Sequence, residues 1–119
     1  MTKKDPIIYL LHIQESIERI DRYVSGRSKQ YLSSSSELQD AVVRRLEIIG
    51  EAVSKLPLVF KQKHKQVPWR QVADMRNFLI HEYFGVDLGI VWKTVKEDLP
   101  KFKKQVAEII KANKQKVIE

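Results

Sequence analysis

One short segment carries four side chains whose chemistry matches metal-free cleavage of RNA. The segment RNFLIHEY contains Arg76, Asn77, His81 and Tyr83. Because imidazole changes charge near neutral pH, His81 can take a proton from a ribose 2′-hydroxyl or protonate a leaving 5′-oxygen. Arg76 presents a planar fork of donors, which can hold a phosphate and stabilise the charge that develops on its oxygens.

The spacing brings these groups to one side of a helix. Asn77 and His81 are one turn apart, so Asn77 can orient the imidazole or donate to the phosphate. Arg76 and Tyr83 are nearly two full turns apart, and Tyr83 can donate a hydrogen bond or stack on a base. In a helix that continues to Tyr83, the four polar groups lie on an arc of about 160°.

Structural roles are the alternative for each of these residues. A lone histidine in a helix is more often a satisfied core or surface residue than a catalyst, as His12 and His64 illustrate. Arg76 can pair with Glu51 or Asp74, and tyrosine usually packs with a hydrogen-bonded tip.

The amino-acid composition excludes several classes of protein and of functional site. The 119 residues predict one domain over 1–119, and 43% apolar content is sufficient for a core. The absence of cysteine excludes disulfides, zinc–thiolate sites and a cysteine nucleophile. The three histidines are far apart in sequence, so we expect neither a metal nor a cofactor. No segment resembles a signal peptide or a membrane span, which predicts a cytoplasmic protein.

The charge favours a polyanionic partner such as RNA. The formal net charge is +7, from 22 Lys+Arg and 15 Asp+Glu. Two groups of cations are candidates for steering phosphates: Lys61, Lys63, Lys65 and Arg70 in one, and Lys101, Lys103, Lys104, Lys111, Lys114 and Lys116 in the other. The alternative is a solvated, lysine-rich surface.

Helical periodicity predicts an all-α, up-and-down bundle of about five helices with short connections. We expect helices that start at Pro6 after an Asp5 cap, after Ser34 or Ser36, at Pro68, after Asp87, and after Asp98 with Pro100 following. The stretch SGRSKQYLSSSS is expected to be a loop, and residues 57–67 a connector with a short helical turn.

Apolar stripes define the faces that these helices should bury. The first stripe is Ile7, Leu10, Leu11, Ile13, Ile17, Ile20 and Val24; the second is Leu38, Ala41 or Val42, Leu46, Ile49, Ala52 or Val53, and Leu56. Trp69, Val72, Met75 and Leu79 should face inward from the third long helix, and Phe102, Val106, Ile109, Ile110 and Val117 from the last.

At this point the chain resembles a known family. RNFLIHEY matches the Arg-x4-His-x-Tyr pattern of HepT-like toxins in the HEPN superfamily. The stretches AVVRRLEIIGEAVSKL and VPWRQVADMRNFLIHEYFGVDLGIVWKTVKEDLP resemble the family along nearly their whole length. The family usually has a glycine after the histidine, where this chain has Glu82.

The resemblance implies a HEPN-like bundle that forms a homodimer, with its two motifs facing a shared cleft. It implies a metal-independent endoribonuclease toxin, paired in a type VII-like system with an MntA-type nucleotidyltransferase antitoxin. The tyrosine that receives AMP in the family corresponds to Tyr83, where AMP would block the RNA phosphate beside Arg76. Glu51 and Glu82 are further candidates for the cleft.

A homodimer also has an argument from chemistry, because acid and base roles need two groups on opposite sides of the phosphate. Phe78, Phe84 or Trp92 are candidates for its contact, and a place in the monomer core is their alternative. Two rival functions are a catalytically weak RNA- or nucleotide-binding partner of the nucleotidyltransferase, favoured by Glu82, and a purely structural dimeric bundle.

Overall fold

A computed structural model describes residues 5–81 and 87–118; for residues 76–81 and 114–118 it describes the backbone alone. All the regular elements of the described part are helices, and it contains no strand. Its elements are α1 (Pro6–Val24), α2 (Lys29–Ser34), α3 (Ser36–Ser54), α4 (Leu58–Lys63), α5 (Trp69–His81), α6 (Leu88–Lys93), the π-helical turn η1 (Thr94–Asp98) and α7 (Leu99–Ile118). The expected all-α class is confirmed.

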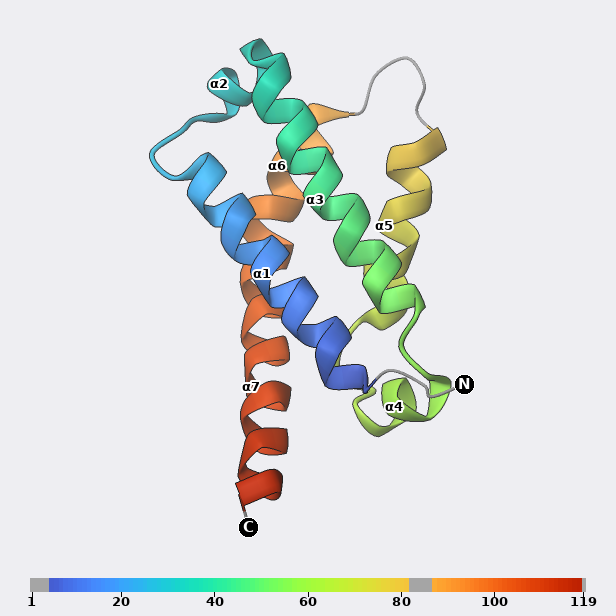
Figure 1. Cartoon of the computed structure of the whole chain (residues 1–119). Coiled ribbons are helices and arrows are strands. Elements are labelled where there is room, and N and C mark those ends of the chain that lie inside the picture. The colour runs from blue at the N-terminus through green and yellow to red at the C-terminus, as the bar shows by residue number, and fades with distance from the viewer. Residues whose placement is uncertain (1–4, 82–86, 119) are drawn as a thin grey trace.

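The long helices alternate in direction. Figure 1 shows α1 rising from the end where α4 lies, α3 descending, α5 rising again, and α6 to α7 descending as one long rod. Helix α3 packs between α1 and α5, and α7 packs on α1. This is the expected up-and-down arrangement, with the first turn of α5 near the last turn of α3 (Figure 1).

The start of α1 is the one that the sequence predicts. The Asp5 carboxylate accepts a hydrogen bond from the Ile7 amide at 2.9 Å, and Pro6 occupies the first helical position. The apolar stripe is buried from Leu10 to Val24, except that Leu11 is 42% exposed. The prediction for Leu11 was therefore wrong, since it lies on the flank of the stripe.

Helix α2 corrects the prediction of a loop over the serine-rich stretch. The Ser28 hydroxyl caps this helix by accepting from the Tyr31 amide at 3.1 Å, and the Leu32 side chain is fully buried. One buried leucine stabilises a short helix that its polar neighbours do not predict.

Helix α3 begins one residue away from both expected caps. The Ser35 hydroxyl, and not that of Ser34 or Ser36, accepts from the Leu38 amide at 3.1 Å. Four consecutive serines are equivalent in sequence, and the position of Leu38 in the core selects among them. The predicted apolar face is confirmed: Leu38, Val42, Leu46, Ile49, Ala52, Val53 and Leu56 are buried.

The connector after α3 contains the expected short helical turn, α4, with Pro57 immediately before it. Helix α5 then begins at Trp69, one residue after the predicted start at Pro68. Trp69 is buried, and Val72 and Met75 pack partly buried against the core.

The last third of the chain differs from the prediction of two separate helices. Asp87 caps α6 as expected, because its carboxylate accepts from the amides of Gly89 at 2.9 Å and Ile90 at 3.2 Å. The helix does not stop at Asp98, however. It continues through η1 into α7, with the Leu99 amide donating to the Thr94 carbonyl.

The π-helical turn gives a physical reason for this continuity. Pro100 lacks an amide hydrogen and sits in the first turn of α7, where that loss is tolerated. A change of hydrogen-bond register just before the proline lets the rod continue without a break. Phe102, Val106, Ile109 and Ile110 are buried on α7 as expected.

Within residues 5–81 and 87–118, no helix is both long enough and apolar enough to cross a membrane.

Candidate functional site

Helix α5 carries three of the four motif residues. Arg76, Asn77 and His81 lie in the last two described turns of this helix, Trp69–His81. Because the helix is continuous through this stretch, Asn77 and His81 share a face one turn apart. Tyr83, Glu82 and Phe84 lie outside the described residues, and so do the side chains from Arg76 to His81.

The start of α5 is held by a set of aromatic contacts. The Trp69 ring lies 6.1 Å from the Phe60 ring and 6.0 Å from the Phe102 ring, the latter edge to face. The Trp69 indole donates a hydrogen bond to the His64 carbonyl at 2.9 Å. These contacts join α4, α5 and α7, and they set the direction in which α5 carries the motif.

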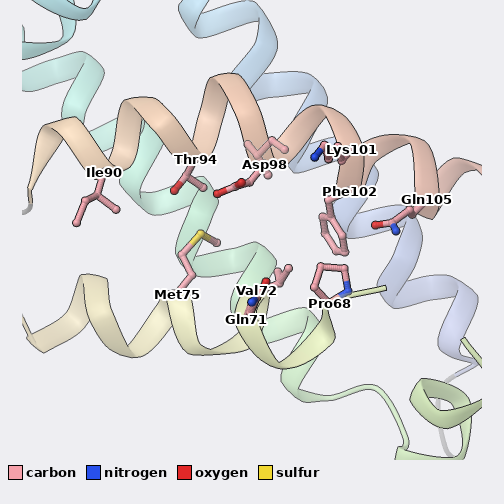
Figure 2. A pocket seen from close by; sticks show the side chains of 11 residues that line it. Pro68, Gln71, Val72, Met75, Ile90, Thr94, Asp98, Lys101, Phe102 and Gln105 are labelled. Carbon is pink, nitrogen blue, oxygen red and sulfur yellow. The ribbon is translucent and has the colours of Figure 1, made fainter. Parts of the chain in front are cut away.

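A groove runs beside α5 toward the motif. It has a volume of about 440 Å³ and lies between α5 and the continuous rod of α6, η1 and α7. Figure 2 shows Val72 and Met75 pointing into it from α5, opposite Thr94 and Asp98 on η1, with Phe102 above Pro68. Met75 is the residue before Arg76, so the groove reaches the turn at which the motif begins.

The polar residues of this groove sit among apolar ones. Gln71, Thr94, Asp98, Lys101 and Gln105 line it together with its apolar side chains. Asp98 and Lys101 are opposite charges, so the charges that line the groove balance. An apolar cleft with a few convergent polar groups is typical of a ligand site, and the π-helical turn that forms one wall is a feature frequent at functional sites.

A second hollow lies at the other end of α5. It has a volume of about 490 Å³, and three cations, Lys61, Lys65 and Arg70, line it. The charge analysis of the sequence named these residues, but the hollow itself has no signature in sequence. The spacing of Phe60, His64 and Trp69 is the signal that could have indicated how the connector folds back.

The two acids offered as partners for Arg76 have other contacts. The Glu51 carboxylate is 3.4 Å from the Lys55 ammonium in the last turns of α3, and both side chains are exposed. The Asp74 carboxylate is 3.9 Å from the Arg70 guanidinium. Glu51 thus belongs to the end of α3 near which α5 begins, whereas His81 is at the other end of α5 (Figure 1).

The remaining candidates have ordinary surroundings. His12 is exposed on α1, and the His64 ring lies 4.7 Å from the Phe60 ring. Trp92 is half-buried, with the Lys96 ammonium 4.9 Å from its ring centre. Lys103, expected to face phosphates, is engaged at 2.9 Å by the Asp21 carboxylate. No group of three potential metal ligands occurs among the residues that the structure describes.

Comparison with known proteins agrees with the motif. The model of the family described as ribonuclease HepT-like matches residues 13–109. A protein of Caldanaerobacter subterraneus subsp. tengcongensis described as a proposed RNase is 46% identical over 93% of this chain and 99% of its own length. A protein of Thermococcus cleftensis described as a probable ribonuclease HepT is 47% identical over 80% of this chain and 86% of its own.

A longer relative is also similar. A Methanocaldococcus jannaschii protein described as a gamma-glutamylcyclotransferase and proposed RNase is 49% identical over 91% of this chain. The chain spans about half of that relative, 49% of its length. No solved structure matches the chain. The match to the family model over most of the sequence, together with relatives aligned over nearly their full length, shows that the chain belongs to the HepT-like ribonuclease family.

Proposed function

We propose that the protein is a metal-independent endoribonuclease that acts in the cytoplasm as the toxin of a HEPN–nucleotidyltransferase pair. The observation that carries the proposal is the uninterrupted course of α5 through His81 in a chain of the HepT-like ribonuclease family. This helix holds Arg76, Asn77 and His81 within two turns, at one end of a groove.

The proposed reaction is a transesterification that needs one base and one acid. The base takes the proton of a ribose 2′-hydroxyl, whose oxygen then attacks the adjacent phosphorus. The bond from phosphorus to the 5′-oxygen breaks, and the acid protonates that oxygen. The products are a 2′,3′-cyclic phosphate and a 5′-hydroxyl end. Arg76 binds the phosphate oxygens as their charge grows, Asn77 orients the imidazole, and Tyr83 contacts the RNA.

A homodimer supplies the second proton-transferring group. Each chain has one His81, and a two-fold axis beside the end of α5 would bring two copies to opposite sides of one phosphate. Glu82 is the further residue that we assign to the surroundings of this cleft, whereas Glu51 lies at the other end of α5 and is not assigned to it. Glu82 adds a negative charge next to His81 in the sequence, where the family motif has glycine.

Control by a partner enzyme is the second part of the proposal. An MntA-type nucleotidyltransferase would transfer AMP from ATP to the Tyr83 hydroxyl, with release of pyrophosphate. The new phosphodiester would put a bulky anion near Arg76, where it competes with the RNA phosphate for the guanidinium.

Cleavage of RNA in the presence of EDTA tests the activity. The wild-type chain should cut RNA to 2′,3′-cyclic phosphate ends, and His81→Ala should lose at least about a hundredfold in rate, the lower range for a general acid or base. His12→Ala is the matched control, because it removes an exposed histidine from α1 and should keep full activity. A requirement for a divalent metal, or activity that survives in both Arg76→Ala and His81→Ala, would contradict the proposal.

The same cleavage assay, combined with intact mass, tests the proposed transfer of AMP to Tyr83. Chain co-expressed with the nucleotidyltransferase should gain the mass of AMP and lose cleavage, and Tyr83→Phe should gain no mass. An unmodified chain that is nevertheless inhibited by the partner would rule out modification as the mechanism.

A second candidate is an RNA- or nucleotide-binding partner without cleavage of its own. It is favoured by Glu82, whose carboxylate stands where the family motif has glycine and would repel a phosphate. Equal RNA affinity of the wild type and His81→Ala, with intact RNA in both reactions, would support this binding function over cleavage.

A further inference from the structure

The hollow at the start of α5 gathers positive charge that the proposed reaction does not use. Lys61, Lys65 and Arg70 line it, with Lys65 and Arg70 exposed to solvent. From residue 52 to residue 73 the chain contains no acidic residue. Among the side chains that the structure describes, the acid in contact with these cations is Asp74, whose carboxylate lies 3.9 Å from Arg70 in a pair so exposed that water screens most of it.

Contacts with buried residues hold the backbone around the hollow in place. Its floor includes Trp69, which is 5% exposed and hydrogen-bonded to the His64 carbonyl. The amide of Gln105 on α7 donates to the Gln66 carbonyl at 3.3 Å, which ties the connector to the last helix. The connector that runs from Lys61 to Arg70 is therefore held by contacts with α5 and α7.

The cationic hollow and the groove beside α5 meet. Pro68 and Gln71 line both of them, so one surface leads from the cations past Gln71 to Met75. Figure 2 shows Pro68 and Gln71 at one end of the groove and Met75 farther along α5. The groove lies on the face of α5 that carries Val72 and Met75. Asn77 and His81 follow Arg70 by seven and eleven residues, so these three residues share another face of α5, and that face joins the hollow directly to the motif.

We propose that this face of α5 is a track for single-stranded RNA, which extends from the motif and binds its backbone phosphates in the hollow of Lys61, Lys65 and Arg70. The inference rests on the proposed function for its ligand. Arg70 and His81 are separated by eleven residues of helix, about 16 Å at about 1.5 Å per residue. At about 3.4 Å per stacked nucleotide, the hollow engages phosphates about five nucleotides from the cleavage site.

An acidic membrane surface is the competing ligand for these cations. Leu58 and Val59 on α4 are 69% and 74% exposed, and exposed apolar residues beside lysines are typical of surfaces that bind lipid. The position of Arg70 on the face of α5 that also carries Asn77 and His81 favours a strand that follows the helix over a lipid surface. Vesicles rich in phosphatidylserine therefore serve as one arm of the test.

The test compares two double variants of equal charge in a His81→Ala background, in which the RNA stays intact. Lys65→Gln with Arg70→Gln removes two cations from the hollow. Arg22→Gln with Lys29→Gln removes one exposed arginine and one exposed lysine, on α1 and α2, that line neither cavity, and it is the matched control. Fluorescence anisotropy measures binding of a trinucleotide and of a single strand of about 16 nucleotides, over a range of salt concentrations.

The hollow variant should lose about tenfold in affinity for the longer RNA at low salt. The slope of log affinity against log salt should fall by about 1.4, since each contact to a single strand contributes about 0.7. Its affinity for the trinucleotide should not change, because so short an RNA cannot span the track, and this also shows that the variant is folded. The control variant should keep the wild-type slope.

Equal losses in the two double variants, or an equal loss for the trinucleotide, would overturn the track. So would a hollow variant that loses binding to phosphatidylserine vesicles but keeps its affinity for RNA. These measurements need no cleavage, so their outcome is separate from that of the proposed reaction. A chain that binds long RNA through the hollow but never cuts it would contradict the proposed ribonuclease activity and would still support the RNA track.

Discussion

Trp69 illustrates how single residues position the candidate site. Its ring lies between Phe60 and Phe102, and its indole nitrogen donates to the His64 carbonyl at 2.9 Å. An indole buries a large apolar surface while its one donor finds an acceptor, which fixes the ring in a single orientation. The sequence predicted that this residue faces inward, and the structure adds that it forms the floor of the cationic hollow.

Replacing Trp69 by phenylalanine should lower the free energy of unfolding by about 1–3 kcal/mol, from the lost hydrogen bond and the space left beside Phe102. The His64 carbonyl keeps the Val67 amide as a donor at 3.1 Å, so no buried acceptor is orphaned. Urea denaturation measures the effect. Trp92→Phe, which keeps a ring beside Lys96, is the control and should cost less. An equal loss of stability in the two variants would show that the hydrogen bond and packing of Trp69 contribute no more than the contacts of Trp92.

At the scale of elements, side-chain caps decide where helices begin. Asp5 and Asp87 were predicted correctly because each stands alone before an apolar stripe. The serine run was predicted incorrectly, since every serine offers the same hydroxyl and the core position of Leu38 selects Ser35. Asp98 resembles a cap in sequence but lies inside a continuous rod, because η1 changes the hydrogen-bond register before Pro100.

The Asp87 cap supports the start of the helix that follows the motif. Asp87→Ala should cost about 1 kcal/mol of stability, because the Gly89 and Ile90 amides lose their acceptor. Asp87→Asn keeps a side-chain oxygen and should recover most of that loss. Thermal denaturation of the two variants measures the difference. A loss that is as large for asparagine as for alanine would contradict a capping role.

At the scale of the whole molecule, charge and shape are distributed unevenly around the bundle. The net charge of +7 raises the local concentration of any polyanion. Some of the cations are engaged in the fold, as Lys103 is with Asp21 at 2.9 Å, whereas those of the hollow face an open cavity. A strand bound along α5 would lead toward the end at which the dimer axis is proposed.

A shared site predicts behaviour that no single chain can show. Arg76→Ala and His81→Ala homodimers should each be inactive, and mixing them under conditions that allow exchange should restore part of the cleavage if one copy supplies the arginine and the other the histidine. Light scattering should give twice the mass of one chain. Mixtures that stay as inactive as the separate variants, with exchange verified by tagged subunits, would show that each motif works alone.

The sequence by itself determined the long helices and most of the faces that they bury, and it predicted the segment that we propose for the chemistry. Those properties are local, because a 3.6-residue period and a single capping side chain act within one element. It could not reveal the short helix α2, the π-helical turn or the two cavities along α5. These depend on how elements distant in sequence approach one another, which is why only the tertiary structure brought Lys61, Lys65 and Arg70 around one hollow and joined it to the groove that leads to Met75.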